Sequence, residues 1–126
     1  MVIECNSENI EVIKPNKDRD FVVATNEFNS ENMIKYNNYN IDDWKAKERY
    51  EVAYNTLKNN KDKFSFELAK NILAGKYGFM CQYDRKTNAD TVWSVIYDIK
   101  KKQIYRVEGN PSRKKFKEDT RLKFDF

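Results

Sequence analysis

The stretch "TVWSVIYDIKKKQIYRVEG", residues 91–109, decides the fold class of this chain. Residues 91–99 are dense in β-branched and aromatic side chains, which is typical of a strand. Residues 104–109 return as a second strand, and the "KKKQ" between them predicts the turn of an antiparallel hairpin. Near the amino terminus, Val2–Cys5 and Ile10–Ile13 alternate around "NSEN" and predict another hairpin.

Two helices are predicted between these hairpins. Residues 42–60, "DDWKAKERYEVAYNTLKNN", place apolar side chains at helical spacing, and Asp42 or Asp43 is expected to cap this helix. "SFELAKNILAG" predicts a second helix that begins at Ser65 and ends at Gly75, since glycine is the usual residue after a helix. The apolar positions of the first helix are Ala46, Tyr50, Ala53, Tyr54 and Leu57.

The segment "FVVATNEF", residues 21–28, predicts a buried strand that ends on polar groups. Residues 27–40 then form a long polar connection rich in Asn and Tyr, of a length that is often functional. The order of strands, two helices and strands predicts an α+β fold, with helices packed on antiparallel sheets. The length of 126 residues predicts a single domain over residues 1–126.

The composition excludes several kinds of chemistry. The chain has no histidine, which excludes Ser-His-Asp and Cys-His catalysis from within it. Cys5 and Cys81 have no CxxC spacing, so we expect no disulfide framework, no metal site and no cofactor. No apolar run is long enough to span a membrane, and the amino terminus lacks a signal-peptide pattern. We therefore expect a cytoplasmic protein without a membrane partner.

Clustered lysines raise a second class of function. The net charge of +4 is a small difference between 24 basic and 20 acidic residues. Residues 100–102 and the "RKKFK" of residues 113–117 are basic enough to contact a phosphate backbone or another acidic partner. The first cluster is more simply a solvated turn, so a small nucleic-acid-binding or acidic-partner-binding module ranks as the alternative function.

Three stretches together resemble the choloylglycine hydrolase and acyl-CoA:6-aminopenicillanic acid acyltransferase group of linear-amide C–N hydrolases in the Ntn-hydrolase superfamily. "FVVATNEF" is similar to that family's strand ending in Thr-Asn, and "KERYEVAYNTL" is similar to its helix that carries an arginine. "TVWSVIYDIKKKQIYRVEGNP" resembles its late hairpin, which closes on a Gly-x-Pro-like turn. The resemblance implies the carboxy-terminal portion of an αββα Ntn-hydrolase sandwich.

The resemblance also implies site residues. Asn26 is similar to an asparagine whose side chain donates toward the reacting carbonyl oxygen, and a turn-forming asparagine is the alternative. Arg49 is similar to an arginine that orients the nucleophile and a substrate carbonyl or carboxyl, and a surface helix charge is the alternative. Tyr36, Tyr39 and Trp44 are candidates to line an acyl pocket, with packing as the simpler role of each.

The family's nucleophile resembles an amino-terminal cysteine whose own α-amine is the base, a design that needs no histidine. That cysteine lies before the strand that residues 21–25 match, so we expect no hydrolase activity from this chain alone. Cys5 would need cleavage after Glu4 to expose an amine, and a strand role is the simpler one. Cys81 lies in a segment that often reads Cys-x-His, where this chain has Tyr83.

Three interpretations of the chain stay open: a truncated product, half of a split enzyme, or a family remnant used for binding. The first two imply an amino-terminal half as partner, or self-association over an uncovered sheet. The substrate of a complete enzyme would be a small amide. The sequence leaves open whether its acyl group is that of a bile-acid amide, a penicillin-like compound or an acyl amino acid.

Overall fold

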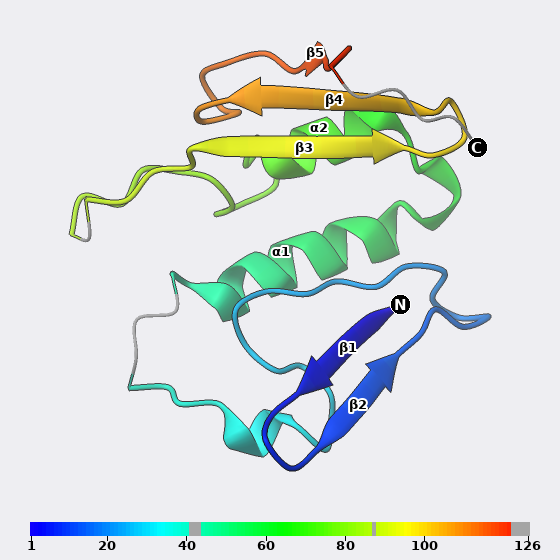
Figure 1. The fold of residues 1–126 in the computed structure, drawn as a ribbon, viewed down its shortest axis with the longest axis vertical. Helices are drawn as coiled ribbons and strands as arrows, with labels where there is room; N and C mark the ends of the chain where they lie inside the picture. Colours follow the sequence, from blue (N-terminus) through cyan, green and yellow to red (C-terminus); the bar gives the residue numbers. More distant parts are fainter. Residues whose placement is uncertain (41–43, 87, 122–126) are drawn as a thin grey trace. The chain divides into compact units, whose positions relative to one another are not determined.

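The computed structural model describes residues 1–40, 44–86 and 88–121, and it contains two compact units, Met1–Asp62 and Lys63–Phe126. Within the described residues each unit combines one α-helix with one small antiparallel sheet, so the predicted α+β class is confirmed (Figure 1). The assignment of all 126 residues to a single domain stays a prediction.

The first unit begins with the predicted amino-terminal hairpin. Strands β1 (Val2–Cys5) and β2 (Ile10–Ile13) pair antiparallel, with Val2 opposite Ile13 and Cys5 opposite Ile10. The side-chain oxygen of Asn6 accepts from the backbone N–H groups of Glu8 and Asn9, which closes the turn between the strands. This is the usual action of asparagine in a turn, and it fixes the register of the hairpin.

The predicted strand at residues 21–25 is wrong: this segment belongs to no sheet. Its apolar side chains pack on a helix instead. Phe21 is 9% exposed and meets the ring of Tyr54 edge to face, with 5.5 Å between the ring centroids. A short apolar run has no periodicity that distinguishes a strand from an irregular segment buried under a helix, which explains the error.

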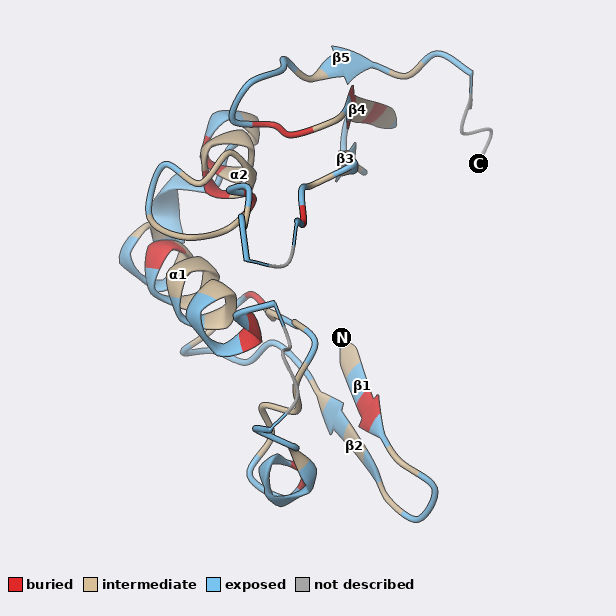
Figure 2. Ribbon diagram, turned by 90° about the vertical axis from the view of Figure 1, so that its left-hand side faces the viewer, coloured by how far each residue is buried: buried red, intermediate tan, exposed pale blue. Residues whose placement is uncertain are grey.

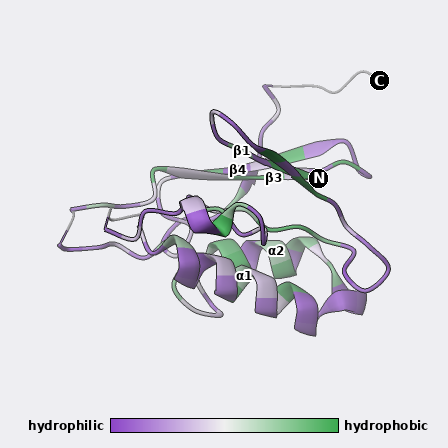
Figure 3. Cartoon of the chain, turned by 90° about the horizontal axis from the view of Figure 1, so that it is seen from below, coloured by the Kyte–Doolittle hydropathy of each residue, from purple (hydrophilic) through white to green (hydrophobic). Residues whose placement is uncertain are grey.

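Helix α1 (Ala46–Asn59) begins later than predicted. Its N-cap is Lys45, in the left-handed conformation with φ of 56°, and it makes no side-chain capping bond; Asp42 and Asp43 lie outside the described residues. The predicted apolar stripe is confirmed in part, since Ala46 is fully buried and Tyr50 stacks on Tyr54 at half-buried positions. Hydrophilic segments alternate with this stripe along the helix (Figure 3).

Residues 27–40, predicted as a polar connection, contain the main buried side chain of the unit. Met33 is completely inaccessible to solvent, while its neighbour Ile34 is 47% exposed. A short 3₁₀ helix, η1 (Ile34–Tyr36), follows directly. A second one, η2 (Lys61–Lys63), lies where the chain passes to the second unit. The connection is therefore a packed segment that is anchored on one unbranched apolar side chain.

In the second unit, helix α2 (Phe66–Leu73) has the predicted ends. Ser65 is the N-cap and its hydroxyl accepts from the backbone N–H of Leu68 at 3.1 Å. Gly75 follows the helix with φ of +72°, a conformation that favours glycine. Leu68 and Ile72 are 7% exposed each and form the buried stripe of the helix.

Helix α2 covers one face of the second sheet. Strands β3 (Trp93–Asp98), β4 (Gln103–Glu108) and β5 (Lys117–Glu118) pair antiparallel in the order β3-β4-β5, which confirms the predicted late hairpin. Phe66 of α2 packs on Tyr105 with 4.3 Å between the ring centroids. On the opposite face Trp93 and Tyr97 remain 51% and 58% exposed. Figure 2 accordingly shows β5 as exposed, while β3 combines exposed with intermediate residues.

Met33→Ala is expected to lower the free energy of unfolding by about 2–5 kcal/mol, because it removes a fully buried side chain and leaves a cavity. Urea unfolding followed by circular dichroism measures the change. Ile34→Ala is the matched control: this neighbour is half exposed, and its loss should cost less than about 1 kcal/mol. Equal losses for the two variants would contradict the anchoring role of Met33.

Candidate functional site

Asn26 and Arg49 meet in the first unit. Asn26 follows the segment that packs on α1, and Arg49 lies in the first turn of that helix. The Nη2 atom of Arg49 donates to Oδ1 of Asn26 at 2.5 Å, and its Nε donates to the backbone oxygen of Trp44 at 2.9 Å. The two predicted catalytic residues, 23 positions apart in sequence, are thus joined by a direct hydrogen bond.

This bond fixes which way the Asn26 amide faces. A guanidinium group only donates hydrogen bonds, so the atom that meets Arg49 must be the amide oxygen. The Nδ2 group of Asn26 therefore points away from Arg49, and no described residue accepts from it. Asn26 is exposed, so its two N–H donors are available to a ligand. A turn-forming role does not account for the arginine contact.

A cavity of about 450 Å³ lies beside Asn26, wholly within the first unit. It is bounded by strand β1, residues 24–28 and residues 36–38. Asn26, Cys5 and Tyr36 are among its lining residues. A volume of this size falls in the range of small-molecule sites. The donor of Asn26 is therefore at the edge of a space that an acyl compound would fit.

The three predicted acyl-pocket residues differ in position. Tyr36 lines the cavity, and its hydroxyl accepts from Nδ2 of Asn9 at 3.0 Å. Tyr39 is 68% exposed, and its hydroxyl accepts from Asn37 at 3.4 Å. Trp44 is 51% exposed and contacts Arg49 through its backbone oxygen. Neither Tyr39 nor Trp44 lines the cavity.

The segment that follows Asn26 is held by a buried carboxylate that the sequence analysis did not identify. Glu4 is 6% exposed, and its two oxygens accept from the backbone N–H groups of Asn29 at 2.7 Å and Ser30 at 2.9 Å. Glu11, directly opposite Glu4 in the hairpin, accepts from Nδ2 of Asn32. Two like charges on one face repel, and donors from residues 29–32 offset that repulsion.

Asn37 holds the same segment from its other side. Its Oδ1 accepts from the N–H of Phe28 and its Nδ2 donates to the oxygen of Phe28, each at 2.8 Å. The Asn37 side chain thus exchanges two hydrogen bonds with the backbone of Phe28, as a paired residue of an antiparallel sheet would do. In the sequence, only the abundance of asparagine in residues 27–40 hinted at such contacts, and it did not identify Asn37.

Neither cysteine is an activated nucleophile in this structure. Cys5 is exposed and lines the cavity, but its nitrogen is a peptide N–H within β1 and supplies no amine base. Cys81 is 4% exposed, and burial raises the pKa of its thiol, which disfavours the thiolate at neutral pH. Hydrogen bonding from Ser112 opposes this effect, but the net shift of the pKa is upward.

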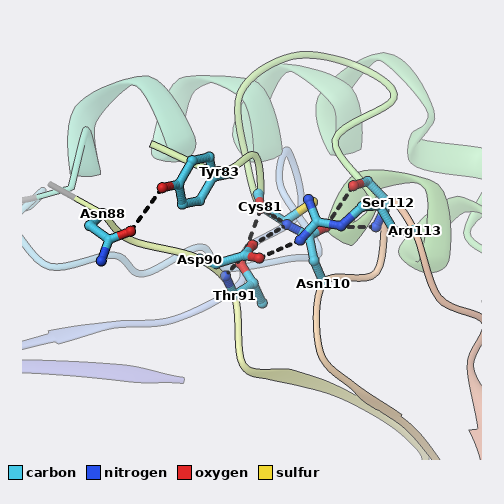
Figure 4. Close-up of polar contacts among 8 residues, drawn as sticks. All are labelled: Cys81, Tyr83, Asn88, Asp90, Thr91, Asn110, Ser112 and Arg113. Carbon is cyan, nitrogen blue, oxygen red and sulfur yellow. Dashed lines mark hydrogen bonds and ion pairs between the residues drawn. The ribbon is translucent and has the colours of Figure 1, made fainter. Parts of the chain in front are cut away.

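The second unit contains a polar cluster around Asn110 (Figure 4). Asn110 is 2% exposed; its Nδ2 donates to the backbone oxygen of Cys81 and to Oδ1 of Asp90. Its Oδ1 accepts from the N–H and the hydroxyl of Ser112, at 2.9 and 2.6 Å. Arg113 forms an ion pair with Asp90. The cluster ties residue 81 to both ends of the β3–β4 hairpin.

This cluster is a structural clamp rather than a second reactive site. Each polar atom of the Asn110 side chain is bonded to the chain itself, which leaves it no capacity for a ligand. Tyr83, at the position where the related segment often has histidine, bonds only to Asn88, at 2.8 Å, among described residues. The described residues also contain no group of three or more Cys, Asp or Glu side chains placed to hold a metal.

Helices in the described part of the chain are too short and too polar to cross a membrane.

Comparison with known proteins identifies one family. The family model described as "Acyl-coenzyme A:6-aminopenicillanic acid acyl-transferase" matches residues 1–113. The match includes the Asn26–Arg49 pair, the cavity and the clamp. Neither the curated proteins nor the solved structures compared with the chain gave a match.

Glu4→Gln is expected to lower the free energy of unfolding by about 1–3 kcal/mol, because an amide offers one oxygen where two part-buried N–H groups need acceptors. Amide exchange at Asn29 and Ser30 should accelerate in the same variant. Glu8→Gln, a change at an exposed position of the same hairpin, is the control and should leave both quantities unchanged. Unchanged exchange in Glu4→Gln would contradict the anchoring role.

Asn110→Ala should raise the pKa of Asp90 toward its ordinary value. The Asn110 amide, followed by Arg113 and the N–H of Thr91, holds that pKa below normal by stabilising the carboxylate. A carboxyl whose pKa is lowered by folding adds stability above its unfolded pKa and loses it as pH falls through its folded pKa. The wild-type chain should therefore keep this stabilisation to a lower pH than the variant.

An NMR titration of the Asp90 carboxyl carbon measures the effect. Arg113→Gln serves as the comparison and should also raise the midpoint, since the arginine both donates to the carboxylate and carries the opposite charge. A midpoint that does not move in Asn110→Ala would show that the clamp does not set the charge state of Asp90.

Proposed function

Because the chain belongs to the acyl-coenzyme A:6-aminopenicillanic acid acyl-transferase family, we propose that it acts in hydrolysis or acyl transfer at a linear amide C–N bond. The family is one of Ntn hydrolases, and the α+β architecture agrees with that fold. The observation that carries the proposal is the bond between Arg49 and Oδ1 of Asn26, which leaves the amide donors directed away from the arginine.

In this proposal Asn26 donates to the carbonyl oxygen of the scissile amide. That oxygen becomes negatively charged as the carbonyl is attacked, and a fixed donor then contributes on the order of 3 kcal/mol to the transition state. Arg49 orients the amide and polarises it, since a cation bonded to the oxygen strengthens donation from the nitrogen. Glu4 and Asn37 keep the segment that follows Asn26 in place.

The attacking group comes from outside residues 1–126 in this proposal. An amino-terminal cysteine with its own amine as base requires no histidine, in accord with the composition. Buried Cys81 and mid-strand Cys5 lack such a base. The chain would then be the carboxy-terminal portion of an αββα sandwich, inactive alone, with a family-like amino-terminal half as its partner.

Exposed apolar faces support such a partner. The hairpin β1–β2 turns Glu4 inward, and Ile3, Ile10 and Val12 on its other face are 57%, 72% and 45% exposed. In the second unit Trp93 and Tyr97 are similarly exposed on β3. A sheet covered on one side normally carries polar residues on the other, so these apolar faces are suited to pack against a partner. A second copy of the chain is the other candidate to pack on them.

The substrates we propose are small amides of the bile-acid, penicillin-like or acyl amino acid type. Of the three predicted pocket residues, Tyr36 is best situated to contact an acyl group, because it lines the cavity with Asn26. Tyr39 and Trp44 would contribute only if an acyl group extended beyond that cavity.

The test measures binding of penicillin V, a glycine-conjugated bile acid and an acyl amino acid to the full chain by ligand-observed NMR. Asn26→Ala should weaken binding of the accepted amide about tenfold, because its carbonyl loses a fixed donor. Asn38→Ala is the matched control, since Asn38 lines the same cavity without contacting Arg49, and should change affinity less than about twofold.

Equal effects of the two asparagine variants would contradict the role of Asn26. None of the amides should be cleaved by the chain alone. Turnover that disappears in Cys5→Ser would instead identify Cys5 as the nucleophile and overturn the proposed division of the enzyme.

A further inference from the structure

The second unit contains a groove that the amide chemistry does not use. Its volume is about 610 Å³, and it lies over the end of β4 and the segment that leads into and out of β5. We name it the basic groove. Its charged lining residues are Arg106, Lys114, Lys115, Lys117 and Arg121, with Glu108, Glu118 and Asp119. The family match ends at residue 113, so all three lysines of the groove lie beyond it.

Both arginines of the groove are already paired. Nε of Arg106 donates to Glu108 at 2.6 Å. Arg121 meets both oxygens of Asp119, at 2.8 and 2.7 Å, and its hydrogen bonds lower the pKa of that carboxyl to about 2. Asp119 is therefore ionised throughout the physiological pH range and is held by Arg121. Each arginine of the groove thus already has a carboxylate partner within the chain.

The three lysines have no such partners. Among the described residues, no carboxylate pairs with Lys114, Lys115 or Lys117. Glu118 is the remaining acid, and strand alternation directs it to the face of Tyr105, whereas Lys117 shares the face of Arg106. The groove's lining thus carries five cations against three carboxylates, and none of its three ammonium groups is ion-paired with a described residue.

The fold places these three lysines along one groove. Lys117 lies opposite Arg106 in the β4–β5 ladder, and the N–H of Lys114 donates to the backbone oxygen of Asn110 in the clamp. The side chain of Lys114 lies over Gly109, where a β-carbon would come within 3.0 Å of Nζ. Gly109 therefore leaves room for that lysine, and its φ of +97° also favours glycine.

We propose that the basic groove binds the phosphate groups of a phosphorylated small molecule. Lysine ammonium groups are compact point charges that suit tetrahedral phosphate oxygens, whereas planar carboxylates are matched best by the arginine fork. Arg121 already uses its fork on Asp119, and Arg106 already donates through Nε to Glu108. Three ammonium groups within one groove match a diphosphate or triphosphate better than a single anion.

Nucleic acid fits this arrangement less well. A phosphodiester backbone needs cations along a continuous track. The other lysine cluster, residues 100–102, lies in the turn before β4, while Lys117 lies opposite Arg106 in the second half of that strand (Figure 1). About four residues of β4 separate the turn from the level of Lys117, which is roughly 13 Å of strand. The lysines thus form two separate clusters rather than one continuous track.

Inorganic pyrophosphate titrated into the full chain tests the proposal, with calorimetry for affinity and NMR for location. Binding should shift the amide signals around residues 114–117 and weaken with added salt. The triple variant Lys114→Gln/Lys115→Gln/Lys117→Gln should lose about tenfold or more in affinity. Lys76→Gln/Lys86→Gln/Lys100→Gln is the matched control: it removes equal charge from exposed positions of the same unit outside the groove.

Each outcome decides the proposal. Groove-localised binding that only the groove variant weakens supports it, and a nucleoside triphosphate should then bind at least as well as pyrophosphate. Equal losses in both triple variants, or no binding at millimolar pyrophosphate, would overturn it. A single-stranded oligonucleotide that binds far tighter than pyrophosphate, with a steep salt dependence, would assign the groove to nucleic acid instead. Since Asn26 is not among the residues that line the groove, Asn26→Ala should leave pyrophosphate binding unchanged.

Discussion

The buried carboxylate of Glu4 is the constraint on which the first unit depends. A carboxylate is costly to bury unless its oxygens are hydrogen-bonded, and Glu4 meets this condition by accepting from the N–H groups of residues 29 and 30. The bonds join the amino-terminal hairpin to a segment 25 positions away. They also explain why the hairpin buries its glutamate face and leaves Ile3 and Val12 exposed. Asn26 lies just before the segment that is fixed in this way.

Asn110 has the same function in the second unit. It too is a buried polar side chain, and its donors and its acceptor all form hydrogen bonds within the chain. Its contacts join residues 81, 90 and 112, which flank the β3–β4 hairpin. In both units a small apolar core is thus supplemented by one satisfied polar residue. Such networks specify a single arrangement because an incomplete set of bonds would be expensive.

The sequence predicted the elements whose signals are local. The hairpins around "NSEN" and "KKKQ" and the ends of α2 depend on turn residues, a capping serine and a glycine, and each was confirmed. The strand predicted for residues 21–25 was wrong, because an apolar run indicates that a segment is buried but does not indicate which element covers it. The Phe21–Tyr54 contact, like the roles of Met33 and Glu4, depends on residues far apart in sequence. The alternation of apolar residues in the first hairpin would even have predicted that the face with Ile3 and Val12 is buried, whereas the buried face carries Glu4.

The site was predictable to a similar extent. Resemblance singled out Asn26 and Arg49, but no pattern in one sequence fixes their mutual contact or the direction of the amide. That direction has a chemical consequence. An arginine placed directly at the substrate would bind a neutral carbonyl, a carboxylate product and a developing oxyanion alike, which adds affinity without favouring the transition state. In the proposed mechanism a neutral amide held by Arg49 instead presents a fixed donor, which gains most when charge develops on the carbonyl oxygen. In that mechanism the arginine acts through Asn26, and its charge stays away from the acyl group.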